Sequence, residues 1–242
     1  MTDPKAPVVL VVEHEPACPP AHFGTWLEEA GAVVAVARPW AGEEVPALAA
    51  YDALLVMGGS MGANDDDTTP WLGAVKERVR EAAAIGLPTL GICLGHQLVA
   101  VALGGSSERN AAGQQVGLYD VGWTDAATDD DLVSAVTGRR RSVQWNSDVV
   151  TELPEGAVVL AATAEGELQA ARFGERVWGV QFHPEVDEPL VRSWAAGDRD
   201  DHLEKGIDQE AVLAEIDTAR GELDEAWRPL ASRFAEIARR AR

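Results

Sequence analysis

The sequence has only two cysteines, Cys18 and Cys93, among its 242 residues. Two cysteines provide no framework for a disulfide-stapled secreted domain, and Cys18 lies in a proline-rich stretch. No run of about 18 apolar residues is present, which is the length that a membrane-spanning helix needs. The N-terminal stretch also lacks the basic start and the long apolar core of a signal peptide. These absences predict a protein of the reducing cytoplasm that does not enter a membrane.

Basic residues are scarce as well. The chain has 20 lysines and arginines against 40 aspartates and glutamates, which gives a formal net charge of −20. Nucleic acids and anionic membranes should repel such a chain, so neither is expected as a partner. Residues 65–67 and 129–131 are acidic triplets, but no ligand spacing accompanies them, and solvated loops are the better interpretation. We therefore expect neither a metal site nor a cofactor.

Hydrophobic residues make up 46% of the chain, enough for a sizeable core in one large α/β domain. Strand-like apolar runs alternate with helical stretches through the first hundred residues. The expected strands are 7–12, 32–37, 53–57 and 87–92, and the expected helices are 23–30, 70–84 and 97–103. This alternation predicts a mostly parallel, open sheet with helices on both faces and a ligand site beyond the carboxyl ends of the strands.

The second half of the chain changes character. Short strand-like segments predict a small antiparallel section over 117–123, 142–145, 157–162, 167–172 and 176–181. Helical spacing then appears over 189–195, 209–220 and 223–240. We predict a main domain over residues 1–195 and a C-terminal helical extension over 196–242 that packs on the same domain.

The C-terminal helices have two interpretations. Six apolar residues fall at the spacing of a buried helix face: Val212, Ile216, Leu223, Trp227, Leu230 and Phe234. A cap packed on the sheet is therefore expected, and a docking or dimerisation element is the alternative. Among the eight tryptophans, Trp71, Trp194 and Trp227 lie on helical faces and are expected in the core. Trp145 is expected to border the ligand pocket.

Cys93 lies in the segment TLGICLGHQ, residues 89–97, between a predicted strand and a predicted helix. Gly91 and Gly95 flank the thiol at both second neighbours, as in the thiol form of a nucleophile elbow. Glycine is needed there because side chains in so tight a turn would collide with neighbouring backbone. The helix N-terminus behind the sulfur favours a thiolate. A small, buried, unreactive thiol is the alternative.

A nucleophilic thiol needs a base, and the base needs a group that orients it. His183 and Glu185 are candidates, because residues two apart in an extended segment face the same side. The carboxylate could then reach one ring nitrogen while the other faces the thiol, and Pro184 would stiffen the arrangement. A structural histidine at the end of a strand is the alternative.

A tetrahedral intermediate also needs hydrogen-bond donors for its oxyanion. Gly58 and Gly59 follow a predicted buried strand and expose backbone N–H groups without side chains. The N–H groups of Gly59 and Leu94 could together form a two-donor hole. An ordinary tight turn is the alternative, whereas a phosphate cradle lacks the Gly-Lys-Ser/Thr that should follow it.

Three segments give the sequence a clear resemblance: MGGSM at 57–61, GICLGHQ at 91–97 and GVQFHPE at 179–185. In this order and spacing, they resemble the class I, triad-type glutamine amidotransferases. They resemble more closely the stand-alone proteins similar to the amidotransferase domain of GMP synthase. The resemblance covers roughly residues 7–195 and implies a flavodoxin-like α/β fold.

The resemblance also implies roles for individual residues. Cys93 would attack the γ-amide carbon of glutamine, while the N–H groups of Gly59 and Leu94 hold the oxyanion. His183, oriented by Glu185, would protonate the departing ammonia and then activate water to hydrolyse the γ-glutamyl thioester. The expected substrate-binding residues are Gly58, Gln97 and Asn146.

Two departures from the family pattern bear on the substrate and the partner. Relatives of the GMP synthase type carry a histidine in a His-Gly-Asp stretch, whereas this chain has Asn146 followed by Ser147 and Asp148. Because asparagine cannot become charged, recognition of the γ-glutamyl group is expected to differ. No acceptor or synthetase domain is recognised after the triad, so ammonia is expected to pass to a separate synthetase protein, or the reaction is expected to end at hydrolysis. Nothing in the sequence specifies the ammonia acceptor or the oligomeric state.

Three functions follow from these residues. The first is a glutaminase that serves as the ammonia-supplying subunit of a partner synthetase. The second is a free-standing hydrolase of a γ-glutamyl peptide or amine, which would share the triad and need no partner. The third is a non-catalytic regulatory module on the same fold.

Overall fold

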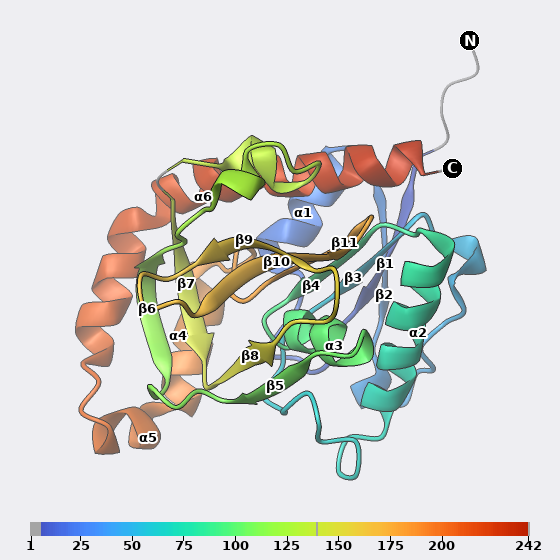
Figure 1. The fold of residues 1–242 in the computed structure, drawn as a ribbon. Coiled ribbons are helices and arrows are strands. Elements are labelled where there is room, and N and C mark those ends of the chain that lie inside the picture. Colours follow the sequence, from blue (N-terminus) through green and yellow to red (C-terminus); the bar gives the residue numbers. More distant parts are fainter. Residues whose placement is uncertain (1–5, 139, 242) are drawn as a thin grey trace.

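A seven-stranded sheet forms the centre of the computed structural model, which describes residues 6–138 and 140–241 (Figure 1). Its strands lie in the order β2-β1-β3-β4-β11-β10-β9. The first five are parallel, and β10 is antiparallel to both of its neighbours. Their bounds are β1 Val8–Val12, β2 Val33–Ala37, β3 Ala53–Val56, β4 Thr89–Ile92, β9 Val158–Ala162, β10 Leu168–Gly174 and β11 Val177–Val180. The predicted mostly parallel α/β sheet is confirmed.

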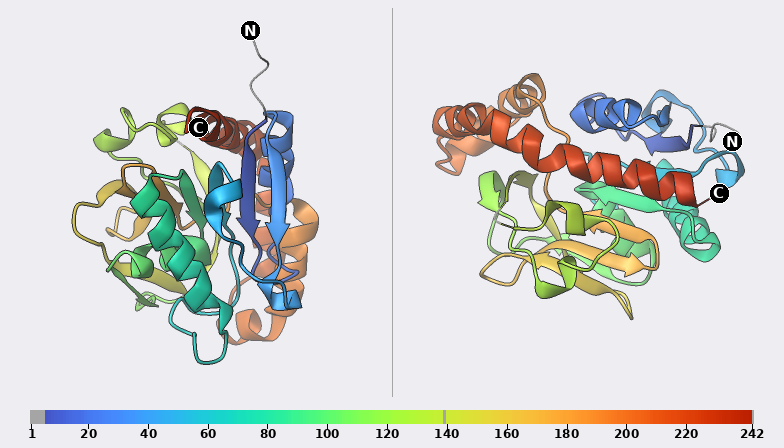
Figure 2. Two further views of the ribbon diagram at one scale, coloured as in Figure 1. Left: turned by 90° about the vertical axis from the view of Figure 1, so that its right-hand side faces the viewer. Right: turned by 90° about the horizontal axis from the view of Figure 1, so that it is seen from above.

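Helices cover both faces of this sheet (Figure 2). Helices α1 (Ala21–Glu29) and α6 (Gln209–Arg240) pack on one face, and α2 (Trp71–Ile85) and α3 (Leu94–Ala102) pack on the other. Strand β1 shows why: Val9 and Val11 join the core under α1 and α6, while Leu10 and Val12 join the core under α2 and α3. No helix in the described ranges is both long enough and apolar enough to cross a bilayer.

Two small antiparallel sheets extend beyond the main sheet, β5 with β8 and β6 with β7. Strands β5 and β8 were not predicted, because they are short and mostly polar and have no apolar alternation. The remaining elements are β5 Ser106–Arg109, β6 Gln115–Asp120, β7 Arg141–Asn146, β8 Asp148–Glu152, α4 Glu188–Gly197, α5 Arg199–Glu204 and the 3-10 turns Pro39–Ala41, Leu48–Ala50, Asp125–Ala127 and Val133–Val136.

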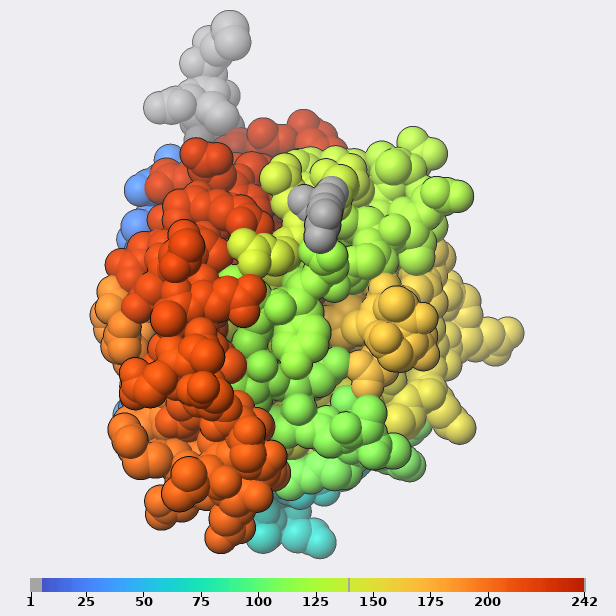
Figure 3. Space-filling model, turned by 90° about the vertical axis from the view of Figure 1, so that its left-hand side faces the viewer, coloured from blue at the N-terminus to red at the C-terminus, as the bar shows by residue number. Residues whose placement is uncertain are grey.

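Helix α6 corrects the prediction of two separate C-terminal helices. It runs without a break through Gly221 and Pro229, because its apolar stripe continues across both residues and is buried along its length. Figure 3 shows α6 beside the segment that contains β6 and β7. On the other side it meets α1, where Arg228 lies 5.8 Å from the centre of the Trp26 ring and pairs with Glu29.

The six apolar residues predicted to face the core from α6 do so. Five are buried, and Val212 is partly buried against the same core. The boundary after residue 195 stays a prediction. We propose that the C-terminal helices belong to the same folding unit, because α6 supplies buried side chains to the core that also contains α1 and β1.

Trp227 provides a test of that proposal. Its side chain is 1% exposed, lies 4.7 Å from the Phe182 ring between centres, and donates through Nε1 to the Arg141 carbonyl at 3.2 Å. We expect Trp227→Ala to lower the free energy of unfolding by about 3–5 kcal/mol, measured by denaturant titration. Trp40→Ala, at a site where 37% of the residue is exposed, is the control and should cost less. Equal losses in the two variants would contradict a core role for α6.

Candidate active site

Cys93 connects β4 to α3 in a strained turn. Its backbone has φ +52° and ψ −109°, a left-handed conformation that costs a residue with a side chain about 1–3 kcal/mol. A Cβ on Gly91 would lie 2.4 Å from the Gly95 carbonyl oxygen, and one on Gly95 would lie 2.0 Å from the Val56 carbonyl oxygen. The prediction that side chains would collide at both flanking positions is confirmed.

The Gly58–Gly59 loop (residues 57–62) follows β3, the neighbour of β4 in the sheet. A Cβ built on Gly58 would lie 3.4 Å from His183 Cε1 and 3.6 Å from Cys93 Cβ. One built on Gly59 would lie 2.9 Å from a methyl group of Leu94. Leu94 is the first residue of α3, so its N–H is one of those that a helix leaves without an intrahelical partner. The fold thus brings Gly59 and Leu94 together beside the thiol.

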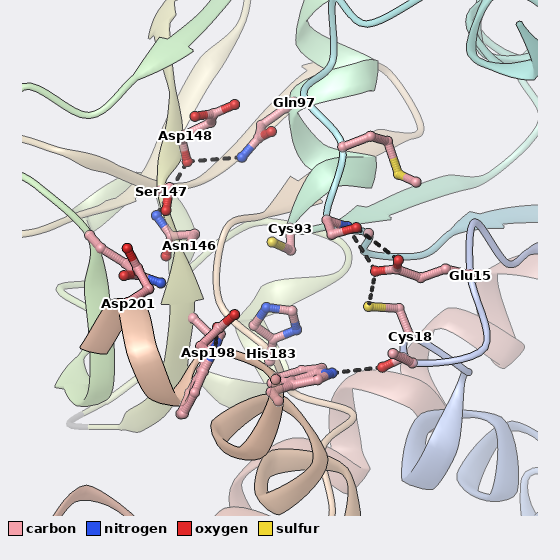
Figure 4. Close-up of a pocket in the computed structure, with 18 of the residues that line it drawn as sticks. Glu15, Cys18, Cys93, Gln97, Asn146, Ser147, Asp148, His183, Asp198 and Asp201 are labelled. Atoms are coloured by element: carbon pink, nitrogen blue, oxygen red, sulfur yellow. Dashed lines mark hydrogen bonds between the residues drawn. The ribbon is translucent and has the colours of Figure 1, made fainter. Parts of the chain in front are cut away.

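His183 and Glu185 follow β11 and form the predicted pair. The Nδ1 atom of His183 lies 2.7 Å from Glu185 Oε1, and both side chains are almost fully buried. Within the described residues, the opposite ring atom, His183 Nε2, has no hydrogen-bond partner. His183 and Cys93 both line the same pocket (Figure 4), so a ring oriented by the carboxylate stands next to the thiol.

The charge state of His183 follows from its surroundings. Burial by itself disfavours the imidazolium, but the negative charge of Glu185 and the nearby Cys93 sulfur outweigh burial and raise the pKa of His183 to about 10. At neutral pH the ring is therefore a cation between a carboxylate and a sulfur. Such a ring can give a proton to a leaving amine and can stabilise a thiolate.

The three other buried histidines, His14, His96 and His202, have the opposite electrostatics, because burial lowers the pKa of each. Burial lowers the pKa of His14 to about 4 and that of His96 to about 3. His14 Nδ1 accepts a hydrogen bond from Trp71 Nε1, and His96 packs against Phe173 under the sheet. Both are neutral structural residues, which leaves His183 as the histidine equipped for proton transfer at the thiol.

The pocket around Cys93 has a volume of about 480 Å³. Figure 4 shows Gln97 and Asp148 on one side of the thiol and Glu15 and Cys18 on the other. Residues from nearly the whole length of the chain meet here, from the β1–α1 loop to α5. The pocket lies at the carboxyl ends of the parallel strands, where the fold predicts a ligand site.

The predicted substrate-binding residues differ in their access to this pocket. Gln97 and Asn146 line it, whereas Gly58 lies beneath it between His183 and Cys93. Gln97 Nε2 donates to the Asp148 carbonyl at 2.9 Å, and Asn146 Nδ2 donates to the same carbonyl at 3.2 Å. Asn146 Oδ1 is buried and has no partner within the described residues, so it is available to accept a hydrogen bond from a ligand.

Sequence reasoning missed several residues at the site. Trp194 was expected in the core, but it lines the pocket, with its ring centre 4.7 Å from that of His183. Its Nε1 donates to the Ala17 carbonyl, so α4 is tied to the β1–α1 loop. Gln181 Nε2 lies 3.7 Å from Cys93 Sγ, as a donor to the sulfur. Neither residue has a local pattern that would reveal its position, although Gln181 lies in the segment that contains His183. Trp145 borders the pocket, as predicted.

Comparison with known proteins decides the family. The model of the glutamine amidotransferase class-I family matches residues 26–189, which is more than half of the chain. The chain belongs to the class-I glutamine amidotransferase family. The match includes Cys93, His183 and Glu185, and it ends before Trp194 and the α5 residues that line the pocket. Part of the pocket wall in this amidotransferase therefore comes from outside the family segment.

Curated relatives extend the likeness over part of the chain. One subunit of a glutamine-hydrolysing GMP synthase from Methanococcoides burtonii is 42% identical over 106 residues, 43% of this chain and 53% of the relative. The same subunit from Saccharolobus solfataricus is 40% identical over 101 residues, 41% of this chain and 52% of the relative. A Clostridium novyi GMP synthase is 35% identical over 114 residues, 46% of this chain and 21% of the relative. These matches thus span about half of the first two relatives and about a fifth of the third.

Solved structures match nearly the whole amidotransferase chain. A glutamine amidotransferase from Thermotoga maritima has a TM-score of 0.84 and 26% identity, covering 95% of this chain and 98% of its own. The fold is also shared with a glutamine amidotransferase from Methylobacillus flagellatus, with a TM-score of 0.83, 22% identity and coverage of 97% and 96%. Both alignments extend well beyond the length of the family segment.

Proposed function

We propose that this amidotransferase hydrolyses glutamine through a γ-glutamyl thioester on Cys93. The proposal is supported most directly by the 2.7 Å contact between His183 and Glu185 next to a thiol on a strained elbow. The Cys93 thiolate attacks the γ-amide carbon, and the carbonyl electron pair moves to the oxygen. The N–H groups of Gly59 and Leu94 donate to that oxyanion.

His183 performs both proton transfers in this scheme. As an imidazolium, it gives a proton to the amide nitrogen, so that the C–N bond breaks and ammonia leaves. The neutral ring then takes a proton from water, whose oxygen attacks the thioester carbon and releases glutamate and the thiolate. Glu185 holds the ring through Nδ1 in both steps and stabilises its charge.

The amino-acid end of glutamine fits the side of the pocket that carries Gln97, Asn146 and Arg109. The unpartnered Asn146 Oδ1 suits the α-ammonium group. Arg109 is 77% exposed at its side chain and pairs with Asp148, so its guanidinium can also reach an α-carboxylate. Gln97 contributes to the shape of the pocket, because its Nε2 already donates to the Asp148 carbonyl and to Gln181 Oε1.

The released ammonia is proposed to pass to a separate synthetase protein. The support is that two matched relatives are named as one subunit of a glutamine-hydrolysing GMP synthase, and such a name describes part of a larger enzyme. A free-standing hydrolase of a γ-glutamyl peptide or amine is the second candidate. It is favoured by the additional pocket wall from α4 and α5, which offers contacts to a substrate longer than glutamine.

Pure protein incubated with glutamine and a panel of γ-glutamyl peptides and amines tests these functions. We expect glutamate release from glutamine and, with hydroxylamine present, γ-glutamyl hydroxamate formed from the trapped thioester. Addition of a partner synthetase should raise the release from glutamine. Turnover of a γ-glutamyl amine alone would instead support the free-standing hydrolase. Absence of both glutamate and hydroxamate with every substrate would contradict both candidates.

A further inference from the structure

Glu15 lies in the β1–α1 loop, across the thiol from Asp148 (Figure 4). Its carboxylate accepts hydrogen bonds from the backbone N–H of Ser60 and from the Ser60 hydroxyl, each at 2.8 Å. The Cys18 thiol donates to it at 3.3 Å. Both contacts to Ser60 join the carboxylate to the Gly58–Gly59 loop, one residue beyond Gly59.

Few other hydrogen bonds hold the Gly58–Gly59 loop. Its ends are fixed, since Met57 N–H donates to the Val12 carbonyl and Gly62 N–H donates to Asp65. Between these ends, Ser60 N–H is the one backbone N–H with a hydrogen-bond partner in the described part of the chain. Two consecutive glycines give this backbone wide conformational freedom. Its position therefore depends on the carboxylate that accepts from Ser60.

The loop must be positioned closely for the chemistry proposed above. An oxyanion donor acts when it lies about 2.7–3.1 Å from the developing charge, and misplacement weakens it. The Gly59 N–H makes no hydrogen bond within residues 6–138 and 140–241, so it is available as that donor. A shift of Ser60 would move the adjoining Gly59 peptide away from Leu94.

We propose that Glu15 is a positioning residue for the oxyanion hole, holding the Gly58–Gly59 loop so that Gly59 N–H and Leu94 N–H point at one site. This role rests on the proposed function. Glu15 acts through Ser60 and does not touch the reacting carbon. Its effect is therefore confined to steps in which an oxyanion forms.

Three variants form a graded test. Glu15→Ala removes both contacts to Ser60, Ser60→Ala removes only the hydroxyl contact, and Glu15→Gln keeps an oxygen that accepts from Ser60 N–H. We expect kcat for glutamine to fall about 10–100-fold in Glu15→Ala, less than the loss of a complete oxyanion donor. The kcat of Ser60→Ala should fall less, and the kcat of Glu15→Gln should be close to that of the wild type. KM should change little, because the ground-state contacts of glutamine are intact.

Alkylation of Cys93 by iodoacetamide separates this role from a general structural one. The sulfur displaces iodide from a saturated carbon, so a C–S bond forms without an oxyanion. Peptide mass spectrometry distinguishes Cys93 from Cys18, whose pKa is raised by burial and by the charges of Glu15 and Cys93. We expect Glu15→Ala to keep the wild-type rate of Cys93 alkylation.

The control variant is Glu13→Gln, two residues earlier, whose carboxylate faces Arg38 and Trp40 and is remote from Ser60. It should keep the wild-type kcat. The positioning role is overturned if Glu15→Ala keeps its kcat, if alkylation slows as much as turnover, or if Glu15→Gln loses as much as Glu15→Ala. A wild-type protein that neither turns over nor forms hydroxamate contradicts the proposed function itself, whereas an active wild type with an equally active Glu15→Ala contradicts only the role of Glu15.

Discussion

Replacement of Cys93 by alanine is expected to abolish glutamate release, with a loss of about 10⁴-fold or more in kcat. The sulfur forms the bond to the γ-carbon, and no other nucleophilic side chain in the described pocket stands at the helix N-terminus beside His183. Hydroxamate formation should disappear with glutamate release, because both products come from the thioester. Both are measured on the same sample.

The second cysteine supplies the matched control for this prediction. Cys18 lines the same pocket, but its thiol faces Glu15 and burial raises its pKa, so it is expected to remain protonated. Cys18→Ala should retain glutamate release. A Cys18→Ala variant as inactive as Cys93→Ala, or a Cys93→Ala variant that still forms hydroxamate, would contradict the assignment of the nucleophile.

Replacement of Glu185 by glutamine should lower kcat/KM for glutamine by about 10²–10⁴-fold. The amide can still contact His183 Nδ1, but it does not stabilise the imidazolium that must protonate the leaving amide nitrogen. Once the negative charge of Glu185 is removed, burial becomes the dominant influence on His183, so the pKa of His183 falls from about 10. The imidazolium is then lost at lower pH than in the wild type.

The pH profile of kcat/KM reports this change, because it follows the ionisation of the free enzyme. The wild type should lose activity on the alkaline side as the pH approaches about 10, where His183 becomes neutral. In Glu185→Gln this alkaline limb should move to lower pH. Glu188→Gln, on an exposed carboxylate that pairs with Arg192 and Arg220, is the control and should keep the wild-type profile. An unshifted limb in Glu185→Gln would show that His183 does not depend on the carboxylate.

The elements that carry these residues could be predicted because their signals are local. Gly91 and Gly95 mark the elbow since no Cβ fits at either position, and that constraint appears in the sequence as two glycines. The spacing of His183 and Glu185 gives a shared face by strand geometry alone. The unbroken apolar run VVLVV of β1 likewise predicts a strand buried on both faces.

The residues that escaped prediction depend on tertiary structure. Trp194 has the spacing of a core residue on α4, yet the position of that helix against the β1–α1 loop turns the ring toward His183. Glu15 is one of many acidic residues, and only the fold places it beside Ser60. The sequence predicts two helices in place of α6 because Gly221 is a local helix breaker, whereas the continuous packing of its apolar side favours one helix.

The contact between α6 and α1 also determines when the core that they share can form during synthesis of the chain. Helix α1 leaves the ribosome early, but the α6 residues that share its core, such as Trp227 and Leu230, are made about 200 positions later. At the usual rate of translation, this separation lasts on the order of 10 seconds. Phe23, Trp26 and Leu27 must stay uncovered by α6 for that time. The native core that contains these side chains is therefore complete only after α6 has been synthesised.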